Sequence, residues 1–303
     1  MKSKTANSFI AAMAAMVIIA AGVNATTHCV RPGGAEGCFA TIGEALSACS
    51  AGDTVVVYPG DYWESVVINT AGVVLMAEGE PCAVKILPPD GDAVRFELGA
   101  DSAIIQGFYI EAIAGSGIFS NRSLSFQIRN CVITRCLQRG IYITNAGVKT
   151  VLNCVIYDNT GTGIECNSNY LYVKNSVIAR NNAWGIDETG DASGVVITAE
   201  YNNVYDNNSG NYHGNIIHTL DISEDPQFDP ESCWHLQPSS PGIDTGDPGM
   251  ASLDCDGTRN DIGIYGGRYA YCGPGPVVTS LQLIPATVVK GETFRIEAVG
   301  AAR

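Results

Sequence analysis

Short apolar runs alternate with bends along most of this chain, and from about residue 104 to residue 208 they recur with a nearly constant period. The dipeptide Gly-Ile begins at residues 117, 140, 163 and 185, so its spacings are 23, 23 and 22 residues. Between these dipeptides a second phrase, Asn-x-Val-Ile, begins at residues 130, 153 and 175. A period of this length predicts stacked units, none of which buries its own apolar face alone.

The residues inside each unit indicate strands. Apolar positions alternate with polar ones, as at Phe126 and Ile128, and Asn and Gly mark tight bends between the runs. The consensus of leucine-rich repeats, which share the period, is missing. About three short strands fit into one unit, and stacking the units pairs each strand in parallel with the one below. We therefore predict an all-β solenoid, a single-stranded parallel β-helix.

The first residues predict a signal peptide. Lys2 and Lys4 precede an apolar run, Phe9–Val23, that is too short to span a bilayer comfortably. Val23-Asn24-Ala25 then supplies small residues at the positions that a signal peptidase reads, so we expect cleavage after Ala25. The prediction is a secreted or cell-surface protein that does not insert into the membrane once residues 1–25 are removed.

One short helix is expected at the start of the mature chain. Thr41-Ile-Gly-Glu44 has the spacing of a capping box, and Ile42, Ala45 and Leu46 follow at helical intervals. A helix at this place would cover the open end of the solenoid and its unpaired strand edges.

The charge of the chain excludes some partners. Its formal net charge is −14, and removal of Lys2 and Lys4 with the leader makes it −16. Such a surface disfavours nucleic acid and anionic membranes, and it would repel an acidic polysaccharide unless a divalent cation bridged the two. We expect a monomer.

The 11 cysteines lie after the predicted leader, where disulfides can form. Cys131 and Cys154 occupy the same place in successive units, and we interpret them as stacked buried thiols. Disulfides are expected near the ends instead, between Cys29 and Cys38, and between Cys233 and either Cys255 or Cys272.

The repeat places equivalent side chains in columns, with a strand spacing of about 4.8 Å between neighbours. One column follows each Gly-Ile and contains Phe119, Tyr142, Glu165 and Asp187. Its two acids would face solvent side by side, close enough to share a calcium ion. A second column, five residues after each repeat Asn, contains Arg135, Asp158, Arg180 and Asn207, which most simply form a surface salt-bridge ladder.

Aromatic residues gather in the central turns. Tyr142, Tyr157 and Trp184 are the candidates for sugar stacking, and Trp184, just before a bend, is the best candidate for an exposed platform. Inward-facing rings would simply belong to the core. We interpret His213 and His218, which lie beyond the regular repeats, as loop residues.

The opening of the chain resembles that of pectin-lyase-like right-handed β-helix proteins. The resemblance rests on Ile42-Gly-Glu-Ala-Leu, Ala51-Gly-Asp-Thr-Val and Tyr58-Pro-Gly-Asp-Tyr, on the Asn and Gly-Ile repeats, and on the closing segment from Asp225 to Tyr265. It covers roughly residues 28 to 268 and implies a right-handed solenoid with a short N-terminal capping helix, of the exported bacterial type. It is unspecific for activity.

By this resemblance, Glu165, Asp187 and Asp158 would hold a calcium ion against a uronate, and Arg180 or Lys174 would act as the base of a polysaccharide lyase. The strict motifs of the lyases, polygalacturonases, pectin methylesterases and alginate epimerases are not visible. If the protein is an enzyme, we expect a polysaccharide lyase or a glycoside hydrolase.

The predicted organisation is a leader at 1–25, a β-helix domain at 26–275, and at 276–303 a linker with the start of an incomplete β-sandwich-like module. For function, we favour binding of polysaccharide through the outer face of the central turns. A calcium-dependent lyase acting on uronate polymers and a structural or adhesive surface protein remain as alternatives.

Overall fold

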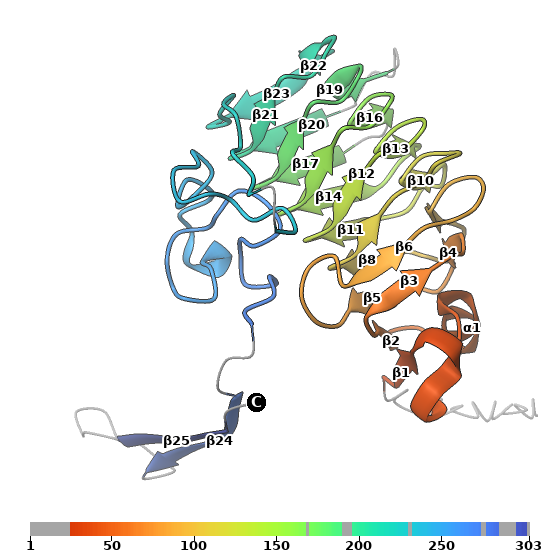
Figure 1. Ribbon diagram of the computed structural model, residues 1–303, viewed down its shortest axis with the longest axis vertical. Coiled ribbons are helices and arrows are strands. Elements are labelled where there is room, and N and C mark those ends of the chain that lie inside the picture. The colour runs from red at the N-terminus through yellow and green to blue at the C-terminus, as the bar shows by residue number, and fades with distance from the viewer. Residues whose placement is uncertain are drawn as a thin grey trace, which may run out of the picture.

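The computed structural model describes residues 25–167, 170–189, 196–229 and 232–273, and the backbone of two strands at 277–284 and 295–301. Its main body is a solenoid whose strands lie in three parallel sheets, as predicted (Figure 1). Successive strands of one coil pass from sheet A to sheet B to sheet C, and each then pairs with the equivalent strand of the next coil. Residues 1–24 of the predicted leader lie outside the described residues.

Sheet A has nine strands, and sheets B and C have seven each, which corresponds to seven complete coils. The strands of sheet A are β1 (Thr27–Val30), β2 (Thr54–Val57), β5 (Val74–Ala77), β8 (Ala103–Gln106), β11 (Phe126–Arg129), β14 (Val148–Leu152), β17 (Tyr170–Lys174), β20 (Val196–Glu200) and β23 (Ile216–Thr219). Those of sheet B are β3 (Gly60–Tyr62), β6 (Val84–Ile86), β9 (Tyr109–Ile110), β12 (Val132–Thr134), β15 (Val155–Tyr157), β18 (Val177–Ala179) and β21 (Asn203–Tyr205). Those of sheet C are β4 (Val66–Ile68), β7 (Val94–Phe96), β10 (Ile118–Ser120), β13 (Ile141–Thr144), β16 (Ile164–Asn167), β19 (Trp184–Glu188) and β22 (Gly210–His213).

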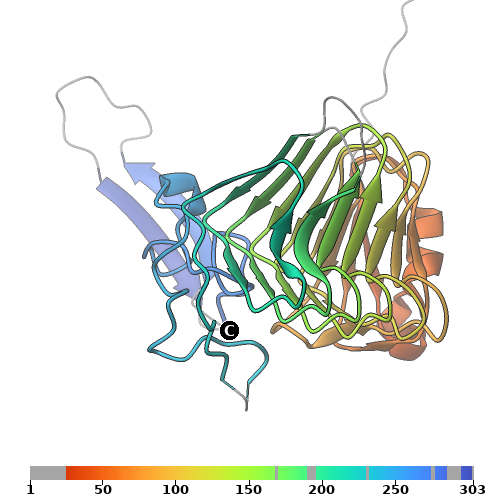
Figure 2. The same cartoon turned by 90° about the horizontal axis from the view of Figure 1, so that it is seen from above.

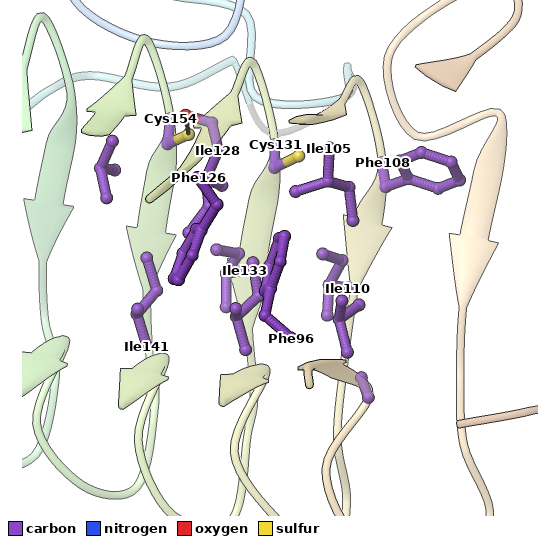
Figure 3. Close-up of a cluster of buried hydrophobic side chains, with 14 of the residues drawn as sticks. Phe96, Ile105, Phe108, Ile110, Phe126, Ile128, Cys131, Ile133, Ile141 and Cys154 are labelled. Carbon is purple, nitrogen blue, oxygen red and sulfur yellow. Dashed lines mark hydrogen bonds between the residues drawn. The ribbon is translucent and has the colours of Figure 1, made fainter. Parts of the chain in front are cut away.

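The interior is filled by columns of equivalent apolar side chains. Figure 3 shows Ile105 beside Ile128 and Ile110 beside Ile133, each from neighbouring coils of the same sheet. The rings of Phe96 and Phe126 stack across the bore, with centroids 4.0 Å apart and planes at 9°. Because each coil repeats the pattern of the last, burial is continuous along the axis, which is why the units need one another for stability.

Two kinds of bend connect the sheets. Asn130, Asn153 and Asn175 stand between sheets A and B with φ of 45°, 49° and 52°, a left-handed conformation that Asn tolerates better than most residues. On the other side of sheet B, a buried ladder of Asn159, Asn181 and Asn207 links the backbones of successive coils.

The N-terminal end is closed as predicted. Helix α1 (Ile42–Ala48) has the complete capping box of Thr41 and Glu44, and it buries Ile42, Ala45 and Leu46 against the solenoid. The carboxylate of Glu64 accepts two further N–H groups from the first turn of the helix, at 2.8 and 2.9 Å. A short 3-10 helix, η1 (Pro32–Gly37), precedes it.

After β23 the chain returns along the outside of sheet B (Figures 1 and 2). Ile262 and Ile264 of this closing segment are buried against Val132, Val155 and Val177, the outward residues of three neighbouring strands. The segment contains one short 3-10 helix, η2 (Met250–Ser252). The bend asparagines fix it in place, since Asn130 and Asn153 donate side-chain hydrogen bonds to its backbone carbonyls.

The disulfides agree with the prediction in part. Cys29–Cys38 is present as predicted, but Cys233 pairs with Cys82, and the two cysteines expected as its alternative partners, Cys255 and Cys272, pair with each other. The prediction was wrong because the closing segment folds back over the early coils and brings together positions 151 residues apart. Cys131 and Cys154 are buried thiols, as expected.

Beyond residue 276, β24 (Val277–Ile284) and β25 (Arg295–Ala301) form an antiparallel pair. The predicted division at residues 275 and 276 stays a prediction. No helix in the described part of the chain is long and apolar enough to cross a membrane.

Candidate functional site

A groove runs along the bend that follows sheet B. It consists of two adjoining cavities of about 480 and 470 Å³ that share Asp158. Strands β9, β12 and β15 supply Tyr109, Thr134 and Tyr157 to its floor, and the closing segment supplies Trp234 to one wall. The groove is therefore built jointly by the central coils and by the part of the chain that returns over them. We call it the sheet B groove.

The second predicted column lines this groove. Arg135, Asp158, Arg180 and Asp206 occupy the first position of the bend in four successive coils, each with φ between 50° and 54°. The fourth member is Asp206 and not Asn207, because the pairing of Val177 with Asn203 shifts this coil by one residue against the pattern of repeat asparagines. Asn207 instead continues the buried ladder.

The aromatic side of the groove is a cluster of three rings. Tyr157 lies 4.9 Å from Trp234 and 5.8 Å from Phe228 between centroids, and Phe228 and Trp234 meet edge to face at 5.0 Å. The Cys82–Cys233 disulfide holds the residue next to Trp234 to the loop before β6. Because these contacts fix the rings, an aromatic surface is preformed at the groove.

The arginines of the groove pair with carboxylates and remain exposed to solvent. Arg135 is 59% exposed and donates to Glu111 at 2.8 Å and to the hydroxyl of Tyr109. Arg180 lies 3.2 Å from a carboxylate oxygen of Asp225 and 3.6 Å from one of Asp206.

Tyr157 and Arg180, two of the proton-carrying groups of the groove, hold their protons firmly. Burial raises the pKa of Tyr157. Burial also opposes the charge of Arg180, but Tyr157 and the carboxylate of Asp225 outweigh it and raise the pKa of this arginine. Arg180 therefore stays protonated, which suits it to hydrogen bonding and to pairing with an anion and makes it a poor proton acceptor.

The first predicted column lies on a different surface, the outer face of sheet C. The register pairs Phe119 with Tyr142, Tyr142 with Glu165, and Glu165 with Asp187, as the spacing predicted. The column continues to His213, which belongs to β22 and is not the loop residue that we expected. His218 likewise lies in a strand, β23. Both histidines were predicted as loop residues because the Gly-Ile and Asn-x-Val-Ile phrases end before these strands.

The two acids of this column are largely buried and do not face solvent as expected, and each already has a side-chain partner. Glu165 accepts from Arg139 at 2.7 Å, and Asp187 lies 2.8 Å from Nδ1 of His213. The ring of His213 in turn stacks on Trp184, with centroids 4.6 Å apart. Trp184 is therefore half-buried and shares its face with a histidine.

The predicted calcium ligands are divided between these surfaces, since Glu165 and Asp187 are on sheet C and Asp158 is in the sheet B groove. Among the described residues, one group of three His, Cys, Asp or Glu side chains has ligand atoms within 4.8 Å of one another, and it lies elsewhere, at the N-terminal cap. The two predicted bases are divided as well. Lys174 is on sheet A, where its Nζ lies 2.8 Å from Asp247 of the closing segment, while Arg180 lines the groove.

A protein-family model described as "Right handed beta helix region" matches residues 84–229, from β6 into the closing segment. The solenoid is a right-handed parallel β-helix. This confirms the predicted fold class. The candidate site residues lie on the outside of this β-helix, in the sheet B groove and on the outer face of sheet C.

Solved structures with a similar arrangement include pectin-processing enzymes. A pectin methylesterase mutant in complex with a hexasaccharide is 11% identical, with a TM-score of 0.39, and the match covers 72% of this chain and 73% of that one. A pectate lyase is 14% identical, with a TM-score of 0.35, over 80% of this chain and 97% of that one. A pectin methylesterase from Aspergillus niger is 12% identical, with a TM-score of 0.36, over 68% and 87%. No curated protein matches the sequence. These weak likenesses carry no information about activity.

Proposed function

We propose that this is an exported protein that binds polysaccharide in the sheet B groove. The observation that carries the proposal is the combination of a preformed aromatic surface, Tyr157 with Trp234, and a column of charged side chains, Arg135, Asp158 and Arg180. Aromatic rings pack on the apolar faces of sugars, and charged donors and acceptors bond to their hydroxyl or carboxylate groups.

The geometry of the column suits a chain-like ligand. Its members repeat once per coil, at about the 4.8 Å strand spacing, which is close to the length of one sugar unit. A polysaccharide that lies parallel to the solenoid axis would therefore meet one charged side chain of the column with each successive sugar, alternately an arginine and an aspartate. Export follows from the predicted leader at residues 1–25, and secretion or display at the cell surface would bring the groove to such polymers.

The test measures binding of the purified protein to a panel of neutral and uronate polysaccharides, with and without calcium. We expect at least one polymer to bind, and the double variant Arg135→Gln/Arg180→Gln to weaken its affinity at least tenfold. A charge-assisted hydrogen bond contributes about 1.5–3 kcal/mol, and about 1.4 kcal/mol is a tenfold change.

A matched control comes from the other face of the β-helix. Arg95 and Arg139 lie over Phe119 and Tyr142 of sheet C, at 4.5 and 4.6 Å from the ring centroids. The double variant Arg95→Gln/Arg139→Gln should leave binding unchanged. Loss of binding in the control variant alone would show that the binding site is on sheet C. If the folded protein binds no polymer of the panel, the proposal is rejected in favour of a structural or adhesive role.

The same panel tests the lyase alternative, which predicts calcium-dependent release of unsaturated uronate that absorbs in the near ultraviolet. The pairing of Glu165 with Arg139 and of Asp187 with His213 favours binding over that chemistry, since a calcium ion would have to displace both partners. A calcium-dependent product that disappears in Arg180→Ala would instead support the enzyme.

A further inference from the structure

Three side chains with metal-binding donors meet at the N-terminal end of the β-helix, far from both outer faces described above. His28 belongs to β1, Cys49 follows helix α1, and Asp53 immediately precedes β2. One donor atom from each, the imidazole nitrogen, the sulfur and a carboxylate oxygen, lies within 4.8 Å of the other two. We call these residues the cap cluster.

The carboxylate of the cap cluster is fixed by the backbone around it. Asp53 is 2% exposed. Its Oδ1 accepts the N–H of Thr26 at 2.7 Å, and its Oδ2 accepts the N–H of Ser50 at 2.8 Å. The same Oδ2 lies 3.2 Å from Nε2 of His28. A bound cation would replace only this last contact, because a carboxylate oxygen has a second lone pair beside the one that Ser50 uses.

Cys49 differs from every other cysteine of the described chain. Three disulfides account for Cys29, Cys38, Cys82, Cys233, Cys255 and Cys272, and the core buries Cys131, Cys136, Cys154 and Cys166. Cys49 is outside the disulfides and is partly exposed. In an exported protein an accessible thiol is open to oxidation, and a metal ion is one partner that would protect it.

We propose that His28, Cys49 and Asp53 bind a zinc ion, with water in the fourth position. Sulfur, imidazole nitrogen and carboxylate oxygen are the ligands that Zn²⁺ takes in proteins, at about 2.0–2.3 Å. A tetrahedral ion at these distances needs its ligand atoms about 3.2–3.8 Å apart. The His28–Asp53 separation of 3.2 Å already meets this requirement, and the sulfur, which now donates to the carbonyl of Ala45, lies within 4.8 Å of both other ligand atoms.

The site would have a structural role. Its three ligands come from β1, from the end of α1 and from the start of β2, the segments that close the first coil. One ion bound to all three would tie the capping helix to β1, which is the edge strand of sheet A among the described residues.

The experiment uses the purified protein, treated with a chelator and kept free of reductant so that its disulfides remain intact. Titration with Zn²⁺ should show one equivalent bound, and Co²⁺ in its place should give a thiolate-to-cobalt charge-transfer band in the near ultraviolet. Cys49→Ser and His28→Gln should each weaken binding about 100-fold or more. His235→Gln is the matched control, because His235 stacks on Tyr265 away from the cap cluster, and it should bind as the parent does.

Failure of the parent protein to bind Zn²⁺, cobalt binding without the thiolate band, or unchanged affinity in Cys49→Ser would each overturn the proposal. Circular dichroism and the unfolding midpoint establish that each variant is folded. If Cys49→Ser does not fold, alkylation of the parent decides the matter. Zinc should slow the reaction of Cys49 with iodoacetamide at least tenfold, and an equal rate with and without zinc would reject the site.

Discussion

The buried asparagine ladder makes a quantitative prediction about what holds successive coils together. Asn181 is 1% exposed and stands in the middle of the ladder. Its Oδ1 accepts both the backbone N–H and the side-chain amide of Asn159, at 3.1 and 2.9 Å. Its Nδ2 donates to the carbonyl of Ile156 at 3.2 Å and to Oδ1 of Asn207 at 2.9 Å. Asn181→Ala removes all four hydrogen bonds at once.

The magnitude follows from the groups that are left without a partner. The backbone N–H of Asn159 loses the acceptor that Asn181 supplied, and the carbonyl of Ile156 loses this donor. The amide of Asn159 keeps its bond to the carbonyl of Ile133, and Oδ1 of Asn207 keeps the backbone N–H of residue 181. One to two orphaned buried groups, at about 1–3 kcal/mol each, predict a loss of about 1–6 kcal/mol in the free energy of unfolding.

The assay is equilibrium unfolding in urea, followed by circular dichroism, for three proteins. Asn182→Ala is the control, because Asn182 is the exposed neighbour on the same bend, and we expect it to change the free energy of unfolding by less than about 0.5 kcal/mol. Asn181→Asp keeps the acceptor but places a buried carboxylate oxygen against the carbonyl of Ile156 and Oδ1 of Asn207, so it should destabilise the protein at least as much as Asn181→Ala. Equal midpoints for Asn181→Ala and Asn182→Ala would refute the idea that the ladder stabilises the stack.

Three further predictions concern the closing segment and the N-terminus. Burial raises the pKa of Asp254 to about 6, so the folded state binds this proton more tightly than the unfolded state. The resulting contribution to the free energy of unfolding is present at about pH 4 and is lost as pH rises through 6. Asp254→Asn should remove this pH dependence from the unfolding profile. Replacing Cys82 and Cys233 by Ala opens a link across 151 residues and should lower the free energy of unfolding by up to about 5 kcal/mol; an unchanged urea midpoint would show that the link contributes nothing. Sequencing of the exported protein should find Thr26 at its N-terminus, and a retained leader or another first residue would contradict the assigned cleavage.

The regular part of the fold was predictable because each coil repeats the same physical solution. Asn and Gly recur where the chain must bend, and alternating apolar residues recur where it must face the bore, so the period of 22 or 23 residues reveals the solenoid. The pairing of Glu165 with Asp187 follows from the same period. Where one coil departs from the period, the predicted register is wrong by one residue, so the expected column contained Asn207 instead of Asp206.

The closing segment could not be placed in this way. It has no repeat, so nothing in the local sequence indicates that Trp234 lies against Tyr157 or that Cys233 pairs with Cys82. The contacts that hold it are between single residues far apart in the chain, such as Asn153 with Asn260, which are separated by 107 positions. The partners of Glu165 were hidden for a related reason, since Arg139 lies outside the column that the period defines.

The regular coils and the closing segment together form the surface of the sheet B groove. The outward residues of sheet B, among them Val132, Val155 and Val177, are apolar, and an uncovered row of this kind would promote association. The closing segment covers them and stops at the bend, where the outward residues become charged. The sheet B groove lies between the closing segment, which covers sheet B, and the uncovered bend that follows this sheet. Phe228 and Trp234 come from the closing segment, whereas Tyr157 and the charged column come from the coils. A ligand that needs both would therefore bind the assembled β-helix and not the repeats alone.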